Sequence, residues 1–369
     1  MPIRIGLVFE YSSINGGENS ILAAIDHLQH RTTEFYAIVH QPGPLVSELE
    51  RRNILVVQLF EGKRPGELLD HLRELVSSLQ LDLLHANSLT IGRRLGRISS
   101  KLSVPTTCHI RDIMQLSSAA LSDLQAHHRL IAVSDATRES YIAQGLPVEQ
   151  IVTIHNGVDL LQFQPAPATG AFKRKLGLPD SAFVCACIGQ ICLRKGQTDY
   201  ATAVSRLGET FPDLHALLIG TRHSTKQETT EYDHQIDTIT EAAGLESRFH
   251  RLGFRQDVPE ILNEIDLLVH TARQEPLGRV LLEAAACGTP IVATRVGGTA
   301  EILTDDESAL LVNPGDIEEM THAISRLVTN PELRGQLGSA ARTAVAARFD
   351  ISHSAERLND LWNEVIQLQ

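Results

Sequence analysis

Aromatic residues are scarce in this sequence, at 4% of 369 residues. Platforms that stack nucleic-acid bases are built from aromatic side chains, so the shortage argues against a nucleic-acid-binding protein. Basic residues are also outnumbered, because 33 lysines and arginines stand against 45 aspartates and glutamates, for a formal net charge of -12. Binding to a phosphate backbone requires a basic surface, so the charge balance argues against the same class of protein.

Long apolar runs and a cysteine framework are also missing, and no signal peptide is expected. No run of about 18 apolar residues is present, so no membrane-spanning helix is expected. The start, M-P-I-R-I-G-L-V-F, lacks the basic and apolar regions of a signal peptide. Five cysteines without framework spacing suggest a reducing compartment, and we expect a cytoplasmic protein. Cys185, Cys187 and Cys192 could ligate a metal, but small core residues are the favoured interpretation.

Short apolar runs alternate with amphipathic segments along the whole chain. This alternation predicts an α/β protein in which β-α units surround parallel sheets. Expected strands in the first half are Ile3–Phe9, Phe35–His40, Leu55–Leu59, Leu81–His85, Pro105–His109 and Leu130–Val133. Those in the second half are Phe183–Gly189, His215–Gly220, Phe249–Leu252, Leu267–His270, Ile291–Ala293 and Ala309–Val312.

The chain is longer than one hydrophobic core usually supports, so two domains are expected. The segment Q-F-Q-P-A-P-A-T-G, residues 162–170, has the prolines and glycine of a linker. We therefore expect an N-terminal Rossmann-like domain over 1–165 and a C-terminal one over 166–350. A helix over 351–369 could pack back on the first domain. In open α/β sheets, ligands bind outside the carboxyl ends of the strands.

Two strand-end loops are candidates for binding an anion. Gly16 and Gly17 follow the first strand and open a helix, where backbone amides can approach an anion. Their spacing matches neither a P-loop nor G-x-G-x-x-G, and a bare turn is the alternative. Arg194 and Lys195 follow a strand of the second half and suit a phosphate group. Exposed loop charges would explain these two residues as well.

Two further strand ends are candidate binding positions, one for a hydroxyl group and one for a flat ring. His109 ends an apolar strand in T-C-H-I-R-D and could bond a hydroxyl group, or it could be a structural histidine. Gly253 and Phe254 stand just past another strand, in L-G-F-R-Q-D-V. A glycine there permits close approach of the backbone to a flat ring, although a plain turn explains it equally well.

Two glutamates bracket the stretch E-P-L-G-R-V-L-L-E, from Glu275 to Glu283. Pro276 predicts a helix that begins there, with Glu283 about two turns inside it. Eight residues then separate the carboxylates by about 12 Å along the axis. Glycosidase pairs lie about 5–9.5 Å apart, so two separate hydroxyl clusters on one ligand are favoured over an acid/base pair. Exposed helix glutamates are the plainer alternative.

Taken in order, these segments resemble a known family. The tract E-P-L-G-R-V-L-L-E-A-A-A-C-G-T-P-I-V-A-T-R-V-G-G-T-A-E-I is similar to the E-x7-E region of family-4 retaining glycosyltransferases. The same order holds for G-G, H-I-R-D, A-V-S-D-A-T-R, H-N-G-V-D, R-K-G and L-G-F-R-Q-D-V. The resemblance implies the GT-B fold, with two doubly wound Rossmann-like domains facing a central cleft.

The resemblance also implies a role for each candidate residue in binding a nucleotide-diphosphate sugar, most simply a UDP- or GDP-sugar. Glu283 would bind the ribose, Glu275 the transferred sugar, and His109 that sugar near the acceptor. The backbone at Gly253 and Phe254 would face the base. The diphosphate would be held by a set comprising Gly16, Gly17, Arg194, Lys195, Pro276, Leu277, Gly278, Arg279 and Val280.

The implied reaction transfers a sugar with retention to a hydroxyl-bearing acceptor such as a glycan, a lipid-linked sugar or a small molecule. His109, Glu275 and Lys195 would be the catalytic residues. Such enzymes need no divalent metal and no cofactor. A donor phosphate oxygen assists deprotonation of the acceptor in a front-face mechanism, so catalysis depends on positioning and charge stabilisation.

Three positions depart from the family pattern. Gln190 stands where an arginine usually precedes the diphosphate lysine, and Arg194 or Arg279 could supply the missing charge. Asn19 and His155 replace residues that are common elsewhere in the family. The Gln190 departure keeps open the alternative of a catalytically silent sugar-nucleotide binding protein. A second alternative is a non-hydrolysing sugar-nucleotide 2-epimerase, which has the same architecture and needs no acceptor.

A basic stripe lies in S-L-T-I-G-R-R-L-G-R-I-S-S-K-L. Arg93, Arg97 and Lys101 recur at four-residue spacing, and the apolar residues of the segment form the opposite face. Peripheral contact with an anionic membrane is one interpretation. A solvated face is favoured, because the whole chain is acidic.

Overall fold

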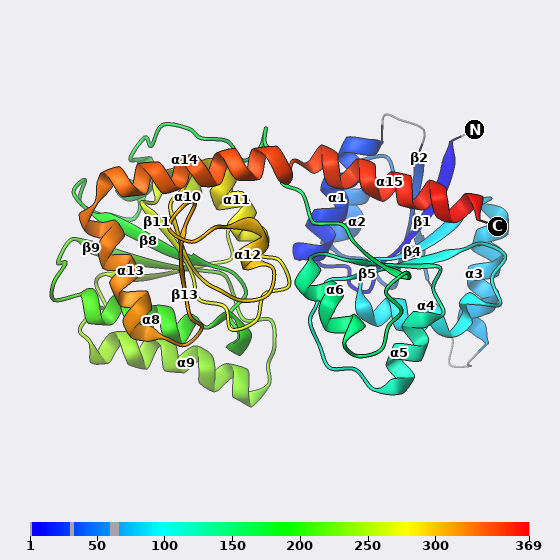
Figure 1. Ribbon diagram of the computed structural model, residues 1–369, viewed down its shortest axis with the longest axis horizontal. Coiled ribbons are helices and arrows are strands. Elements are labelled where there is room, and N and C mark those ends of the chain that lie inside the picture. The colour runs from blue at the N-terminus through cyan, green and yellow to red at the C-terminus, as the bar shows by residue number, and fades with distance from the viewer. Residues whose placement is uncertain (1, 30–32, 60–65, 369) are drawn as a thin grey trace. The chain divides into compact units, whose positions relative to one another are not determined.

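The computed structural model describes residues 2–29, 33–59 and 66–368. They form two compact units (Figure 1). Unit 1 contains the residues up to Gly157 and those from Phe349 onward, and unit 2 is Val158–Arg348. The boundary precedes the proline-rich segment, which lies on unit 2. The Asn263 side chain accepts from Ala166 N at 2.7 Å and donates to Gln164 O at 3.1 Å, so unit 2 satisfies the backbone of that segment.

Unit 1 is built on a parallel sheet with the strand order β3-β2-β1-β4-β5-β6-β7. Its strands are β1 (Ile3–Val8), β2 (Thr33–Val39), β3 (Leu55–Gln58), β4 (Leu83–Ala86), β5 (Thr106–Ile110), β6 (Arg129–Ala132) and β7 (Ile151–Thr153). The central strands β4 and β5 are buried along their whole length, as expected of parallel strands covered on both faces. The six strands that the sequence predicts in this half are confirmed. The three-residue β7 was missed, because it is too short to show a pattern.

Helices cover both faces of this sheet (Figure 1). They are α1 (Gly16–Leu28), α2 (Pro44–Arg51), α3 (Glu67–Ser78), α4 (Leu89–Ser99), α5 (Ser118–Gln125), α6 (Asp135–Ile142) and α15 (Ile351–Gln367). One apolar core lies under α1, α2 and α15, and the other under α3 to α6. The fully buried Trp362 of α15 belongs to the first core, so this C-terminal helix is an integral part of unit 1.

Unit 2 has a six-stranded parallel sheet with the order β10-β9-β8-β11-β12-β13. Its strands are β8 (Phe183–Ile188), β9 (Leu214–Ile219), β10 (Phe249–Gly253), β11 (Leu267–His270), β12 (Ile291–Thr294) and β13 (Leu310–Val312). All six match strands predicted from the sequence. In both sheets the first three strands are added toward one edge and the later strands toward the other, starting beside the first strand of the unit. Each unit is therefore doubly wound, as expected.

The helices of unit 2 lie on both faces of its sheet (Figure 1). They are α7 (Ala171–Lys175), the 3-10 helix η1 (Leu193–Lys195), α8 (Gln197–Leu207), α9 (Gln227–Ala242), α10 (Val258–Glu264), α11 (Arg279–Cys287), α12 (Thr299–Ile302), α13 (Ile317–Thr329) and α14 (Pro331–Arg348). The loops that follow β8 and β11 lie at the carboxyl edge of the sheet, where ligands of such folds bind.

Helix α11 begins later than the sequence predicts. Its first residue is Arg279, and Gly278 before it has a φ of 101°. This left-handed conformation interrupts the helix, so Pro276 lies in the preceding loop and not in the first turn. Glu283 is therefore one turn inside α11, and the axial separation of about 12 Å that we derived from a continuous helix is wrong.

Candidate active site

In unit 2, the loops after β8 and β11 are joined through their backbones. The amides of Arg273 and Gln274 donate to Arg194 O at 2.8 and 3.3 Å. The hydroxyl of Thr271 donates to Lys195 O at 3.1 Å. Gly196 makes this contact possible, since a Cβ at this position would overlap the backbone oxygen of Thr271 and the residue has a φ of 65°. The join places η1 next to the segment that leads to Glu275.

Lys195 and Glu275, 80 residues apart, form a buried ion pair through Nζ and Oε2. The same oxygen lies 2.9 Å from Nε2 of His270, the last residue of β11. Side-chain exposure is 14% for Lys195, 7% for Glu275 and 4% for His270, so water screens these contacts weakly. The structure thus brings two predicted site residues together and adds a histidine.

The charges of this cluster follow from its contacts. Burial alone would raise the pKa of Glu275, but the Lys195 ammonium and the hydrogen bond from His270 bring this pKa well below its usual value. Burial lowers the pKa of His270, and the charges of Lys195 and Arg194 act in the same direction. Glu275 is therefore a carboxylate, and His270 is a neutral imidazole at neutral pH.

Glu283 has a partner on its own helix. Arg279 donates to its carboxylate at 2.7 Å, across the four-residue spacing that aligns side chains on one face. Gly278 is the N-cap of α11 and supplies no side-chain cap, while Leu277 is buried just before it. The N-cap residue therefore offers no side chain to the first backbone amides of the helix, which begins close to Glu275 in the sequence.

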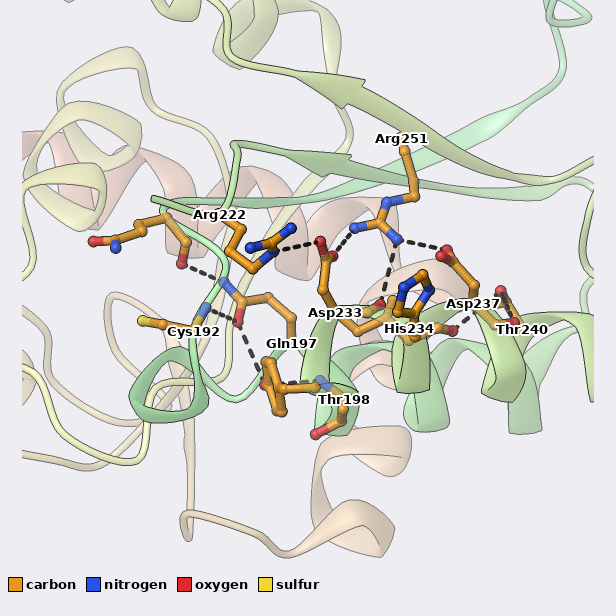
Figure 2. A network of polar contacts seen from close by, with 12 residues as sticks. Cys192, Gln197, Thr198, Arg222, Asp233, His234, Asp237, Thr240 and Arg251 are labelled. Atoms are coloured by element: carbon orange, nitrogen blue, oxygen red, sulfur yellow. Dashed lines mark hydrogen bonds and ion pairs between the residues drawn. The ribbon is translucent and has the colours of Figure 1, made fainter. Parts of the chain in front are cut away.

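The loop after β8 has a second support, from Gln197 at the start of α8. This buried side chain donates to Gln190 O at 2.8 Å and accepts from Cys192 N at 3.4 Å. Tyr232 of α9 donates to the same amide oxygen at 3.4 Å. Figure 2 shows Gln197 directed at Cys192, beside a separate ion-pair network on α9 and β10. Gln197 thus holds the loop whose Gln190 departs from the family pattern.

Gly253 and Phe254, which were predicted to face the base of the donor, lie at the end of β10. Gly253 is the last residue of that strand, with a φ of 64°, and its oxygen accepts from Gly220 N at 2.8 Å. Phe254 follows with 64% of its surface exposed. An exposed phenyl ring at the carboxyl edge is available to a ligand, but its role stays a prediction.

In unit 1, the predicted glycine pair begins α1. Asn15 precedes the glycine pair as the N-cap, and the backbone N–H of Asn15 donates to the Glu18 carboxylate at 3.0 Å. A Cβ on Gly17 would lie 2.9 Å from Cδ of Arg111, so a larger residue at this position would force that side chain to shift. Arg111 donates to Asn87 Oδ1 at 2.8 Å and to Asn156 Oδ1 at 3.0 Å.

His109 is one end of a buried polar chain in unit 1. Its Nδ1 lies 2.9 Å from Nε2 of His85, and Nδ1 of His85 lies 2.8 Å from the hydroxyl of Thr107. The two rings meet nearly at right angles, and Trp362 packs edge-on against His85. Burial, together with the charge of Arg111, holds the pKa of both histidines well below the usual value. His109 is therefore a neutral hydrogen-bonding group.

Comparison with known proteins agrees with this geometry. A family model described as "Glycosyl transferases group 1" matches residues 169–344, and one described as "Glycosyltransferase Family 4" matches residues 14–161. The crystal structure of HepE from Anabaena in complex with UDP-glucose superposes with a TM-score of 0.88 at 23% identity, over 98% of this chain and 100% of that chain. The chain belongs to the family-4 glycosyltransferases of GT-B type.

Two relatives show how far the similarity of this glycosyltransferase extends. An Escherichia coli protein named UDP-Gal:alpha-D-GlcNAc-diphosphoundecaprenol alpha-1,3-galactosyltransferase is 25% identical, over 99% of this chain and 97% of its own length. D-inositol 3-phosphate glycosyltransferase of Stackebrandtia nassauensis is 30% identical, over 59% of this chain and 50% of its own length. The chain thus spans about half of the second relative and nearly all of the first.

Several residues of the glycosyltransferase site were not singled out from the sequence. His270 is the last residue of a buried strand and His85 the last but one of another, so the signal that identified His109 applied to them as well. Asn87, one residue past β4, holds Arg111 and has the same kind of position. What the sequence could not show was the partners, because these contacts join strands and loops that are distant along the chain.

The basic stripe on α4 has an acidic neighbour. Arg97 and Arg93 lie 3.1 and 3.5 Å from the Asp123 carboxylate of α5, and Lys101 is exposed. This pairing favours the solvated face and gives no support to membrane contact. Among the helices in the described ranges, none has both the length and the apolarity needed to cross a membrane.

Proposed function

We propose that this glycosyltransferase moves a hexose or a related sugar from a nucleotide-diphosphate sugar to an acceptor hydroxyl, with retention of configuration and without a metal ion. The observation that supports this most directly is the joined pair of loops in unit 2. It gathers a lysine, an ionised glutamate and the start of α11 at the carboxyl edge of one sheet. Cations and helix-start amides suit a diphosphate, and a carboxylate suits sugar hydroxyls.

Each donor group is assigned to a described residue. Glu283 binds the ribose, Glu275 binds the transferred sugar, and Arg194 with Lys195 and the backbone over 276–280 bind the diphosphate. The strand end at Gly253 faces the base. The family resemblance assigns Gly16, Gly17 and His109 of unit 1 to the donor as well, and these roles stay predictions.

The chemistry then rests on stabilising the leaving diphosphate. Negative charge builds on its phosphate oxygens as the sugar bond breaks, and Lys195 and the α11 amides are the groups that offset it. A donor phosphate oxygen takes the acceptor proton, so no carboxylate acts as a nucleophile. The ion pair agrees with this role, because a carboxylate held by a lysine and a histidine is already engaged as an acceptor.

A UDP-sugar is the proposed donor. The relative that matches over nearly its full length is named for UDP-Gal, and the HepE structure contains UDP-glucose. The acceptor is proposed to be a hydroxyl-bearing glycan, a lipid-linked sugar or a small molecule. The name of that relative includes a lipid-linked GlcNAc acceptor. The 2-epimerase and the silent binding protein are not favoured, since both matched family models describe glycosyltransferases.

The test is transfer from UDP-glucose and UDP-galactose to a GlcNAc-diphospho-lipid analogue, in the presence of a chelator. Proton NMR of the new anomeric centre should show the α configuration of the donor. Glu283→Ala should weaken UDP binding, while Glu275→Ala should mainly reduce transfer. Glu307→Ala, at an exposed position of the same unit, is the control and should change neither.

Each alternative has its own outcome in this test. A β product would contradict retention, and loss of transfer on chelation would contradict the metal-independent mechanism. Isomerisation of the donor without an acceptor would identify the 2-epimerase. Donor binding with no turnover for any acceptor would identify the silent binding protein.

A further inference from the structure

His270 has contacts in unit 2 that the proposed donor assignments leave unused. It ends β11, is 3% exposed, and its Nε2 lies 2.9 Å from Glu275 Oε2. Because His270 is buried, pairing with an exposed charged group does not explain why a histidine occupies this position. A buried imidazole that loses its bonds to water needs a specific partner, and the carboxylate is that partner.

The direction of this hydrogen bond follows from the acceptor. An ionised carboxylate can only accept, so Nε2 of His270 carries the hydrogen and donates it. In the neutral ring Nδ1 is then an acceptor. Nδ1 is buried and has no hydrogen-bond partner among the described residues. The Nε2–H tautomer of His270 is therefore selected, and the hydrogen bond to Glu275 is the one that its ring makes among the described residues.

Two donors meet on one carboxylate oxygen. Lys195 Nζ and His270 Nε2 both contact Oε2 of Glu275, and within the described ranges no hydrogen bond or ion pair to Oε1 is found. A lysine ammonium on its flexible stem restricts orientation poorly, whereas a ring fixed on a buried strand restricts it well. The histidine thus orients the carboxylate and leaves Oε1 for another group.

The two donors also differ in what else they do. Lys195 is assigned to the donor diphosphate, so binding of that group draws its ammonium toward the phosphate oxygens. His270 has no such second partner and keeps Glu275 in place while Lys195 is shared. The carboxylate would otherwise lose its orientation at the step in which sugar binding matters most.

We propose that His270 is a positioning residue, which holds Glu275 through Nε2–H and keeps Oε1 available for the hydroxyls of the transferred sugar. The inference rests on the proposed function, since it needs Glu275 to contact that sugar. It predicts a specific pattern: loss of His270 harms transfer and leaves nucleotide binding intact.

The test compares two substitutions in the full chain. His270→Leu removes the donor at similar volume, and His270→Gln returns an amide N–H near the same place. His270→Leu should lower kcat with the UDP-sugar donor about 10-fold or more, the size seen when the orienting partner of a metal-bound ligand is lost. The Kd for UDP should stay within about twofold, because His270 is assigned no contact with the nucleotide. A twofold change in Kd is about 0.4 kcal/mol. His270→Gln should restore most of the lost kcat.

Two controls separate a positioning role from a merely structural one. His215→Leu changes a buried histidine at the amino end of β9, in the same sheet, and should leave kcat unchanged. Nitrogen-15 NMR of histidine-labelled protein should show His270, assigned by its loss in His270→Gln, as the neutral Nε2–H tautomer. An Nδ1–H ring or an imidazolium at pH 7 would overturn the inference.

The outcomes distinguish this inference from the proposed function. If Glu275→Ala keeps wild-type transfer, the assignment of Glu275 fails, and the positioning role of His270 fails with it. If Glu275→Ala loses transfer but His270→Leu does not, only the inference fails. If His270→Leu weakens UDP binding as much as it lowers kcat, the residue is structural and the inference fails as well.

Discussion

His127 illustrates how a single buried residue links stability to pH. It is 3% exposed in unit 1, and its Nε2 donates to Gly92 O at 2.7 Å. Its Nδ1 lies 2.9 Å from the hydroxyl of Thr106. Protonation would reverse the bond at Nδ1, so that the hydroxyl of Thr106 has to accept, and would place a charge in a site that cannot solvate it. Burial accordingly lowers the pKa of His127 to about 4. The bond to Gly92 O raises this pKa, but by less than burial lowers it.

This lowered pKa predicts that acid destabilises unit 1. The unfolded chain takes up the proton near pH 6.5 and the folded one near pH 4, so stability is present above pH 6.5 and is lost as the pH falls toward 4. From pH 7 to pH 5 the loss from His127 is about 2 kcal/mol. Urea unfolding followed by the fluorescence of Trp362, the single tryptophan, would measure it in unit 1.

The comparison that isolates this effect uses two variants. His127→Gln keeps a side-chain donor for Gly92 O and should lower the free energy of unfolding at pH 7. Its further loss between pH 7 and pH 5 should be about 2 kcal/mol smaller than that of the wild type. His353→Gln, at an exposed position of the same unit, should lose as much as the wild type. Equal acid losses in all three proteins would contradict the assignment.

At the level of residues, the sequence indicates chemistry more reliably than partners. Lys195 and His109 were identified because they are polar side chains at the ends of apolar strands, and Glu275 because it pairs with Glu283 around a predicted helix start. The Lys195–Glu275 pair is not visible in the same way, since 80 residues separate the two. It depends on Gly196, which allows two loops to touch, and the sequence shows only that a glycine is there.

At the level of elements, the strands were predicted well, and the start of α11 was misplaced. Parallel strands buried on both faces are continuous apolar runs, which is why 12 of the 13 strands in the described part of the chain could be located. The start of α11 was misplaced because Pro276 is a common first-turn residue. Gly278 overrides it through a left-handed backbone that brings Leu277 into the core, and this packing is a tertiary effect.

Helix α14 gives a prediction at this scale, because it seats the helix that bears Glu283. A Cβ added to Gly338 of α14 would overlap the oxygen of Gly288, which is the C-cap of α11. Arg342, one turn on, donates to Ala286 O at 2.7 Å. Gly338→Ala should therefore push the helices apart and destabilise unit 2 by about 1–3 kcal/mol.

The control is the other inner glycine of the same helix. Nothing lies within 4 Å of a Cβ added to Gly335, which is exposed. Gly335→Ala should be neutral or stabilise the helix by about 0.5–1 kcal/mol, because alanine loses less backbone entropy. Differential scanning calorimetry of the two variants would separate close packing from helix propensity. Equal shifts in Tm would contradict the packing contact.

At the level of the whole molecule, an acidic chain has to bind an acidic donor. The formal net charge of -12 repels a nucleotide diphosphate at long range, so binding depends on local cations and helix-start amides. Lys195 and Arg279 are each paired with a glutamate, and Gln190 supplies no charge. Donor affinity should therefore depend on Arg194, on the backbone of α11, and on Lys195 and Arg279 being shared between their glutamates and the diphosphate. Salt screens such short-range contacts only weakly.

A thermal-shift screen would identify the base that this arrangement accepts. A ligand at about 100 times its Kd adds roughly 2.7 kcal/mol to the stability of the protein that binds it. UDP-glucose and UDP-galactose should raise the Tm of the wild type at concentrations where GDP-mannose and ADP-glucose do not. Glu283→Ala should lose most of the shift through the missing ribose contact, and Glu307→Ala should retain it. A larger shift with GDP- or ADP-sugars would contradict the choice of a UDP-sugar, whereas an undiminished shift in Glu283→Ala would contradict the ribose assignment alone.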